Sequence, residues 1–550
     1  MSTNTSKEKR EKLISEIKAI RDYIATSPQD ENTGNLLTYL SEIEKDIKGK
    51  KYGLVFEEHR EGIDEVLATH TPVLSEDAVL FINNGGQMNF LIEGDNLASL
   101  QLLEKTHKGK IDLIYIDPPY NTGNQDFVYD DSFVDSNDTF RHSKWLSFMQ
   151  KRLGIAHNLL SNKGAIFISI DANEFAQLKI LCDSIFGEGN FIGNMIWRKK
   201  TGGGQTDEFF VTEHEYIICY RKSSDFRWID FKLEAKIEDF KYEDSKGKYS
   251  IVKLEKWGSS AHKEDRPTMY FPITAPDGTD FYPIAPDGKA GRWRVGNEKL
   301  SSLLLEDKVF WSKDVKKGRW VPYEKVYFDE AKGKLLKSRS ILYDIAETGD
   351  ATKQLTDIFG EKDVFQNPKP IELIEFIIKH CFAYTILDFF AGSGSTGHAV
   401  MKLNAEDDGS RKFILCTNNE NNICRDITYE RIKRVIDNEN YSASLKYYKV
   451  DYVPISDKLY YEYADELLNH IKELVELENG VNFTGNNEIT ILLTEDEVID
   501  FISNEAKLKA CKKVYLGHDV LLDGNQEYIF DQNKIELNII PEYYYKELEA

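Results

Sequence analysis

The chain has 550 residues, of which 41% are hydrophobic and 30% charged, and this balance excludes a disordered protein and predicts several folded domains. The net charge of −23 argues against nucleic-acid binding by the surface as a whole, yet residues 196–345 hold 29 Lys and Arg against 25 Asp and Glu. No apolar run is long enough to span a membrane and the N-terminus lacks a signal-peptide core, so we expect a cytoplasmic protein. The six cysteines stand singly without a metal-binding spacing, and no metal site is predicted.

Residues 1–50 are predicted to form an N-terminal helical segment. Leu13, Ile17, Ile20 and Ile24 recur at helical spacing, and a second such series follows from Leu36. A polar break with a proline at residues 27–30 indicates a helical hairpin. We interpret it as a packing or dimerisation appendage without chemistry.

Residues 51–195 alternate between strand and helix patterns. Residues 90–93 read as a strand that ends in Gly94-Asp95, and the apolar run 111–116 reads as a buried parallel strand. A helix over residues 145–160 precedes another strand at 164–171. This alternation predicts an α/β fold with a doubly wound, mostly parallel sheet.

The segment 196–345 changes character and is predicted to be an inserted mixed α/β domain. It is rich in aromatic residues and glycine, and the turn Ala-Pro-Asp-Gly occurs at residues 275–278 and again at 285–288, which indicates two hairpins. The α/β pattern returns over residues 346–450, the second half of the core. Residues 451–550 are acidic and predict a small C-terminal α/β appendage.

The strand 111–116 runs directly into Asp117-Pro118-Pro119-Tyr120. The two prolines stiffen the loop and remove two N–H donors, which leaves their carbonyls as acceptors. An ionised Asp, a proline carbonyl and a Tyr ring together suit a planar base with an exocyclic amino group. The alternative interpretation is an ordinary turn, because Asp and Pro are common in turns.

A second motif, residues 388–397, reads as a strand end, a glycine-rich turn and the start of a helix. Its glycines allow close approach of a ligand, and the helix N-terminus favours a negative group, as in binding of S-adenosylmethionine; dinucleotide binders use a related loop. An acidic residue, Glu420, ends the next strand, where sugar hydroxyls are bound in such folds. The candidate cofactor-binding residues here are Asp388, Phe390, Gly392, Gly394, Thr396 and Glu420.

With both motifs in this order, the chain resembles the β class of DNA amino-methyltransferases over residues 80–440. In that class a DPPY half comes first, a target-recognition region second and an FxGxG half last, which matches Asp117–Tyr120, residues 196–345 and residues 390–394. The resemblance also places Asp95 near the cofactor adenine, and Lys369 in the element over the methionine end of the cofactor. Within the class, the chain looks most like the modification (Mod) subunit of type III restriction–modification systems.

The resemblance implies methyl transfer from S-adenosylmethionine to the N6 amino group of an adenine flipped out of double-stranded DNA. Asp117, Pro118, Pro119 and Tyr120 would be the catalytic residues, and Asp117 would also lie against the cofactor. The implied partners are duplex DNA, a second copy of the chain in a homodimer, and an ATP-dependent restriction (Res) subunit. Candidates for DNA contacts are Asn121, Arg198, Lys199, Lys200, Arg266, Arg292 and Arg294.

Several alternatives stay open. An adenine methyltransferase without a restriction partner and a cytosine-N4 methyltransferase would use the same motifs. A fused nuclease would use the acidic residues of the repeated turns, Asp277 and Asp287, with Lys289. A DNA-recognition subunit that keeps the fold without catalysis, or an enzyme acting on RNA, is also compatible with parts of the pattern.

Overall fold

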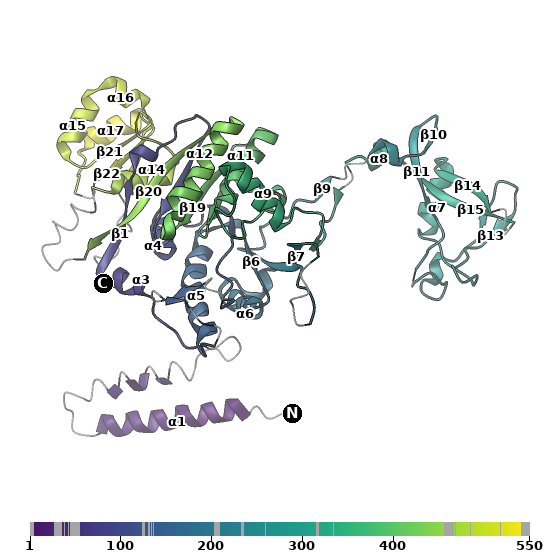
Figure 1. Cartoon of the computed structure of the whole chain (residues 1–550), viewed down its shortest axis with the longest axis horizontal. Coiled ribbons are helices and arrows are strands. Elements are labelled where there is room, and N and C mark those ends of the chain that lie inside the picture. The colour runs from purple at the N-terminus through teal and green to yellow at the C-terminus, as the bar shows by residue number, and fades with distance from the viewer. Residues whose placement is uncertain are drawn as a thin grey trace. The chain divides into compact units, whose positions relative to one another are not determined.

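The computed structural model of the chain describes residues 5–26, 36–37, 39–41, 43–44, 56–123, 127–129, 132–133, 135, 137–202, 209–232, 236–258, 260–314, 318–333, 335–455, 467, 469–484, 486–517 and 519–540. The chain forms two compact units (Figure 1). The first unit contains residues 1–227 and 340–550, and the second contains residues 228–339.

The first unit is built on a ten-stranded sheet. Its strands lie in the order β1 (His70–Glu76), β20 (Ala443–Pro454), β2 (Gln87–Glu93), β19 (Lys412–Thr417), β18 (Thr385–Asp388), β3 (Ile111–Ile116), β6 (Leu160–Ile170), β8 (His214–Arg221), β7 (Phe191–Arg198) and β17 (Ile341–Leu342). The six strands from β20 to β6 are all parallel to one another, whereas β1 runs antiparallel to β20 and β8 runs antiparallel to β6. The predicted doubly wound, mostly parallel sheet is confirmed.

Helices cover both faces of this sheet. From β3 the chain proceeds to β6 on one side, and from β18 it proceeds to β19 on the other, so right-handed crossovers place their helices on opposite faces. The helices of one face are α4 (Asn96–His107), α5 (Arg141–Leu159) and α6 (Phe175–Phe186). The helices of the opposite face are α9 (Thr348–Phe359), α10 (Ile371–Lys379), α11 (Ser395–Asp407) and α12 (Glu430–Glu439).

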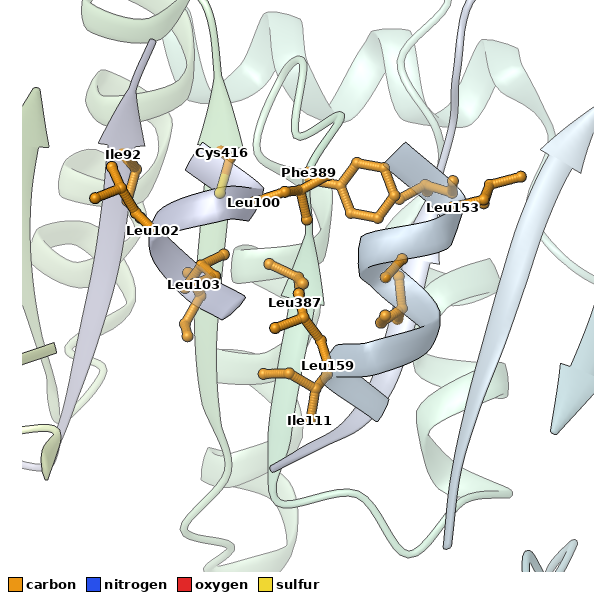
Figure 2. Packing of buried hydrophobic residues seen from close by; sticks show 14 of the residues in the cluster. Ile92, Leu100, Leu102, Leu103, Ile111, Leu153, Leu159, Leu387, Phe389 and Cys416 are labelled. Atoms are coloured by element: carbon orange, nitrogen blue, oxygen red, sulfur yellow. The ribbon is translucent and has the colours of Figure 1, made fainter. Parts of the chain in front are cut away.

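The main core lies where α4 and α5 cover the centre of the sheet. Figure 2 shows leucines of both helices beside apolar side chains of β2, β3, β18 and β19. Leu100, Leu103, Leu153 and Leu387 are each fully buried there. This core fixes the four strands whose ends carry the motifs.

The second unit is smaller than the inserted segment expected from the sequence. Residues 196–227 and 340–345 contribute to β7, β8 and β17 of the large sheet, where their apolar side chains are buried: Trp197 and Tyr220 are 1% and 0% exposed. The unit itself holds an antiparallel sheet of β10 (Tyr242–Asp244), β11 (Gly247–Lys253), β15 (Arg319–Tyr327) and β14 (Val309–Asp314). Its core surrounds Trp293 beside α7 (Asn297–Leu305).

The remainder of the second unit consists of short pairs. The first Ala-Pro-Asp-Gly turn joins β12 (Ile273–Thr274) to β13 (Asp280–Phe281), and the second closes an isolated bridge between Ile284 and Ala290. These two turns are therefore the predicted hairpins. The other short elements are β9 (Phe231–Lys232), α8 (Phe328–Ala331) and β16 (Leu335–Leu336).

The terminal segments add small elements to the first unit. Helix α1 (Thr5–Thr26) is tied by an Arg21–Glu44 ion pair of 2.8 Å to the second helical stretch, as a helical hairpin requires, while its predicted break at 27–30 lies outside the described residues. At the C-terminal end, β21 (Ile489–Leu492), β22 (Lys513–Leu516) and β23 (Glu536–Ile539) form a parallel sheet, accompanied by α15 (Glu495–Ser503), α16 (Glu505–Ala510) and α17 (Gly524–Gln532). The preceding helix, α14 (Ile471–Asn479), packs against α4 and β1. Among the described residues, no helix is long and apolar enough to cross a membrane.

Candidate active site

The two sequence motifs lie at the ends of neighbouring parallel strands. β18 pairs with β3, so the glycine-rich loop after Asp388 and the loop from Asp117 emerge at the same edge of the sheet. The direction of winding reverses between these strands, and in open α/β sheets ligands bind at such a reversal. At that edge, Glu420 follows β19, which is next to β18, and Asp95 follows β2, the next strand beyond β19.

Asp117 lies in a cluster of five charged or hydroxyl groups. The Tyr120 hydroxyl lies 2.7 Å from Asp117 Oδ1 and 3.1 Å from Glu215 Oε2. Lys369 Nζ lies 2.8 Å from Asp117 Oδ2 and 3.4 Å from Glu215 Oε2. Lys199 binds the other oxygen of Glu215 at 3.0 Å. The site thus pairs two carboxylates with two ammonium groups and one phenol.

The electrostatics of this cluster are balanced by Lys369. Burial raises the pKa of Asp117, and the Lys369 ammonium opposes that rise. Burial also acts to raise the pKa of Glu215, but Lys369 and Lys199 together hold it below its usual value. Although burial disfavours its charge, the two carboxylates raise the pKa of Lys369. The ammonium therefore stays charged between the carboxylates.

The backbone of the Asp117 loop is fixed from α5. Trp145 is fully buried, and its Nε1 donates to the Pro119 carbonyl over 2.7 Å. Asn121 follows with a left-handed φ of 57°. Its side chain was predicted to contact DNA, but it is only 1% exposed and donates to Glu174, so it lies inside the protein. Side-chain contact from Asn121 to DNA therefore does not fit this conformation.

The glycine-rich loop is held by its own aspartate. Asp388 Oδ1 accepts from the Phe390 N–H over 3.0 Å, and Oδ2 accepts from the Thr396 hydroxyl over 2.5 Å. Burial raises the pKa of Asp388 to about 7. Asp388 and Thr396, predicted to bind the cofactor, thus bind each other and brace the loop. Their observed contacts are structural ones.

The same loop has the backbone shape needed for close approach of a ligand. Gly392 and Gly394 have left-handed φ values of 48° and 76°, and α11 starts immediately afterwards at Ser395. A Cβ on Gly392 would lie 3.1 Å from the Phe365 ring, which covers the loop from the segment leading to Lys369. A side chain at Gly392 would therefore need the Phe365 ring to shift and would be strained at this φ.

Arg431 supports this loop, and sequence reasoning did not identify it. The side chain is 1% exposed and donates to the Ser393 carbonyl at 3.2 Å and to the Ser395 hydroxyl at 2.8 Å. Burial lowers the pKa of Arg431 to about 10. The one sequence signal for Arg431 was its place in the strongly amphipathic segment that forms α12. Its buried positive charge lies directly behind the loop.

Two other acidic residues line the edge of the sheet. Asp95 caps α4, accepting from the Leu97 N–H at 2.7 Å, and one of its oxygens lies 3.6 Å from the buried Arg152. Glu420 is exposed at the start of a short turn, η5 (Glu420–Asn422). Asp95, Glu420 and the glycine loop therefore form a row of groups along three neighbouring strands.

The predicted DNA-contacting cations differ in their surroundings. In the first unit Lys200 is exposed, while Arg198 pairs with Glu347 at 3.2 Å and Lys199 with Glu215. In the second unit Arg266 is exposed and Arg294 pairs with Glu324. Arg292 is 7% exposed and donates to the Ser260 carbonyl at 2.6 Å, so it braces a loop instead of facing solvent.

The aspartates of the two repeated turns are engaged in hydrogen bonds and ion pairs with nearby side chains. Asp277 accepts from Thr279 and from Trp320 Nε1, and Asp287 lies 3.0 Å from His262. Within the described part of the chain, no group of three or more His, Cys, Asp or Glu side chains is arranged to hold a metal ion. These contacts give the nuclease alternative no support.

Residues 111–433, more than half of the chain, match the model of a protein family described as DNA methylase. The chain belongs to the DNA methylase family. The match begins at β3 and ends in α12, so it includes both motif loops and the second unit. The resemblance predicted from the motif order is confirmed.

Two relatives illustrate the range of this methylase's similarities. It is 38% identical over 391 residues to the type II methyltransferase M.KpnI of Klebsiella pneumoniae, covering 66% of this chain and 90% of that one. It is 35% identical over 361 residues to the StyLTI Mod subunit, a type III restriction–modification enzyme of Salmonella typhimurium, covering 61% of this chain and 53% of that one. The chain thus spans about half the length of that subunit.

Among solved structures, the PvuII DNA methyltransferase, described as cytosine-N4-specific, is 12% identical with a TM-score of 0.33. The alignment covers 66% of this chain and 97% of that one. At this level of similarity it adds nothing to the topology described above.

Proposed function

We propose that this DNA methylase transfers a methyl group from S-adenosylmethionine to the N6 amino group of an adenine flipped out of duplex DNA. The observation that carries the proposal is the pairing of β3 with β18, which brings the Asp117 loop beside the glycine-rich loop. A base held by the first loop would face a donor held by the second. Transfer between two bound substrates depends mainly on such positioning.

The residues present suit the methyl donor. Gly392 and Gly394 take left-handed φ values at the start of α11, where a carboxylate is favoured, and the buried Arg431 adds positive charge behind them. Glu420 stands where ribose hydroxyls would be bound, and Asp95 where the purine would lie. When bound, S-adenosylmethionine supplies an electrophilic methyl group on its sulfonium.

Asp117 would act on the target base. Adenine N6 is a weak nucleophile because its lone pair is delocalised into the ring. A carboxylate has about four acceptor positions, so Asp117 can accept from the amino group while Lys369 and Tyr120 keep their bonds to it. Those two partners fix the carboxylate in one orientation, and the preorganised charge polarises the amino group toward the methyl carbon. Flipping the base out would cost a few kcal/mol.

The proposal is tested by sequencing the methylated bases in DNA from cells that express the chain. We expect N6-methyladenine at one short sequence, lost in Asp117→Ala and retained in the matched control Asp135→Ala, since Asp135 is an exposed loop residue. N4-methylcytosine at the site would instead support the cytosine alternative. Unmodified DNA from cells that contain the folded protein would reject both.

We further propose that the chain acts as the modification subunit of a type III system, as a homodimer in the cytoplasm that can join an ATP-dependent restriction subunit. The Mod relatives support this assignment. The 90% coverage of M.KpnI supports a second candidate, a methyltransferase that works without such a subunit. Methylation of one strand at an asymmetric site would favour the first, and methylation of both strands at a palindrome the second. Light scattering of the purified chain tests the dimer.

A further inference from the structure

A buried carboxyl group lies directly behind the Asp117 loop. Glu174 is 0% exposed and stands before the first turn of α6, but its side chain does not cap that helix. Its Oε1 instead lies 2.5 Å from Asn121 Nδ2 and 2.6 Å from His142 Nδ1. Three segments that are distant in the sequence thus meet at one oxygen atom: the catalytic loop, the start of α5 and the start of α6.

The hydrogen-bond directions in this cluster are determined by its neighbours. Asn121 Nδ2 also donates to the Arg141 carbonyl at 3.2 Å, which can only accept, so the amide orientation is fixed. Arg141 Nε donates to His142 Nε2 at 3.2 Å, so the proton of the neutral imidazole lies on Nδ1 and is donated to Glu174. Glu174 Oε1 therefore accepts two hydrogen bonds.

Two other buried oxygen atoms of the cluster are unsatisfied. Asn121 Oδ1 and Glu174 Oε2 have no hydrogen-bond partner among the residues that the structure describes. Both are acceptors if the carboxyl is ionised, and a buried unsatisfied acceptor costs about 1–3 kcal/mol. They belong to the same two side chains that the Nδ2–Oε1 bond already joins. One proton on Oε2 would satisfy both atoms.

We propose that Glu174 keeps its proton at neutral pH and donates it to Asn121 Oδ1, so that an acid–amide pair clamps the catalytic loop to the start of α6. Glu174 is then a positioning residue: it acts on Asn121, the residue that follows Tyr120. The clamp rests on the proposed function only in so far as the loop it holds is the catalytic one.

The charged surroundings of Glu174 agree with this assignment. Burial raises the pKa of Glu174 to about 8, with Asp171 adding to the rise and Arg141 and the Asn121 bond opposing it. His142 contributes no positive charge at neutral pH, because burial and Arg141 lower its pKa. A neutral Glu174 carboxyl group needs no cation to balance it. Gln177, at 3.4 Å from His142 Nδ1, completes the polar groups that these elements place there.

The clamp should open at alkaline pH. Once the proton leaves, Oε2 and Oδ1 are two acceptors without a shared hydrogen, and Asn121 loses one of its restraints. The native state binds this proton more tightly than the unfolded chain does, so its stabilising effect is complete in acid and is lost as pH rises through about 8. Methyl transfer should fall over the same range.

The first test detects the proton on the Glu174 carboxyl group directly. In the full-length protein with isotope-labelled glutamate, infrared spectroscopy should show the C=O band of a protonated glutamate at pH 7, absent from Glu174→Gln. Loss of the wild-type band as pH is raised above 8 supports the proposal, and its absence at pH 7 overturns it. Absence of the band from the wild-type protein at pH 7 overturns the proposal without any variant, and the measurement does not depend on methylation, so it is decisive even if the proposed activity fails.

The second test compares two variants. Glu174→Gln carries an N–H where the acid carries O–H, so it should keep the clamp and lose the alkaline fall in methylation rate. Glu174→Ala should reduce that rate about 10- to 100-fold, as expected for a misplaced catalytic group. The wild-type folding constant should change by up to about tenfold per pH unit relative to Glu174→Gln between pH 5 and 8. Identical pH profiles for wild type and Glu174→Gln would overturn the assignment.

Discussion

The ion cluster at Asp117 makes a quantitative prediction for Lys369→Met. The Lys369 ammonium lies 2.8 Å from one carboxylate and 3.4 Å from the other, and the side chain is 8% exposed. With an effective dielectric constant of about 20, these contacts are worth roughly 6 and roughly 5 kcal/mol. The cost of burying the ammonium, several kcal/mol, offsets much of this sum. Breaking a buried pair by removing one partner costs about 3–5 kcal/mol, which is the expected loss of unfolding free energy.

The charge of Glu215 determines how much of this loss can be recovered. In Lys369→Met, Asp117 and Glu215 lose the cation that contacts both of them, and only Lys199 still pairs with Glu215. In Lys369→Met/Glu215→Gln a single carboxylate, that of Asp117, remains with the Tyr120 hydroxyl. The double variant should therefore be about 1–3 kcal/mol more stable than the sum of the single effects predicts. The loss in Lys369→Met should also shrink toward acidic pH, since removing the cation raises the carboxylate pKa values and the native state then gains protons.

Urea unfolding followed by circular dichroism at pH 5 and pH 8 measures these free energies. Lys163→Met, at an exposed position of β6, is the matched control and should change stability by less than about 0.5 kcal/mol. Additive effects of the two substitutions, together with a pH-independent loss in Lys369→Met, would refute the coupling between Lys369 and the two carboxylates.

Three further predictions concern the surrounding structure. Gly397→Ala should destabilise the protein by up to about 2 kcal/mol. Its Cβ would lie 2.7 Å from Ile432 Cδ1, and overpacking costs about 1–3 kcal/mol against a helix gain of about 1 kcal/mol; a raised unfolding midpoint would contradict this. Glu61→Gln should cost about 3 kcal/mol in urea unfolding, since Glu61 binds the buried Arg152 through two contacts of 2.8 and 2.9 Å; a loss below about 1 kcal/mol would show that the pair is weak. Glu420→Ala should weaken S-adenosylmethionine binding about tenfold in calorimetry without a change in stability, and equal affinity would remove Glu420 from the cofactor site.

The fold was predictable wherever the pattern of residues is local. The apolar run 111–116 and the strand before the glycine-rich loop are buried parallel strands, as expected, because strands covered on both faces read as continuous apolar runs. Residues 214–221 were placed in the inserted segment, yet they form β8 of the large sheet. Their apolar pattern predicts a buried strand but does not specify the sheet that it joins.

The motif residues of the site could be predicted from the sequence, whereas most of the buried charged residues around them could not. Sequence reasoning identified Asp117, Tyr120 and Lys369, which lie together in the structure. It did not identify Glu215, Glu174 or Arg431, although each is at least 94% buried. From the sequence alone, a charged residue in a strand or helix is expected to face solvent, because its neighbours in space are not known. Conversely, the cationic pattern suggested a free Arg292, which the structure buries.

The sequence by itself determined the class of this protein: two loop motifs, their chemistry and their order along the chain. These are local properties, since a glycine that permits a turn or a proline that stiffens a loop acts on its own backbone. Only the tertiary structure decided which charges share the Asp117 site and which carboxyl lies behind the loop. Glu215 reaches Asp117 through the order of strands in the sheet, Lys369 through the loop before α10, and the burial of Glu174 depends on three segments meeting. Such long-range packing fixes the electrostatic environment that governs each carboxyl group.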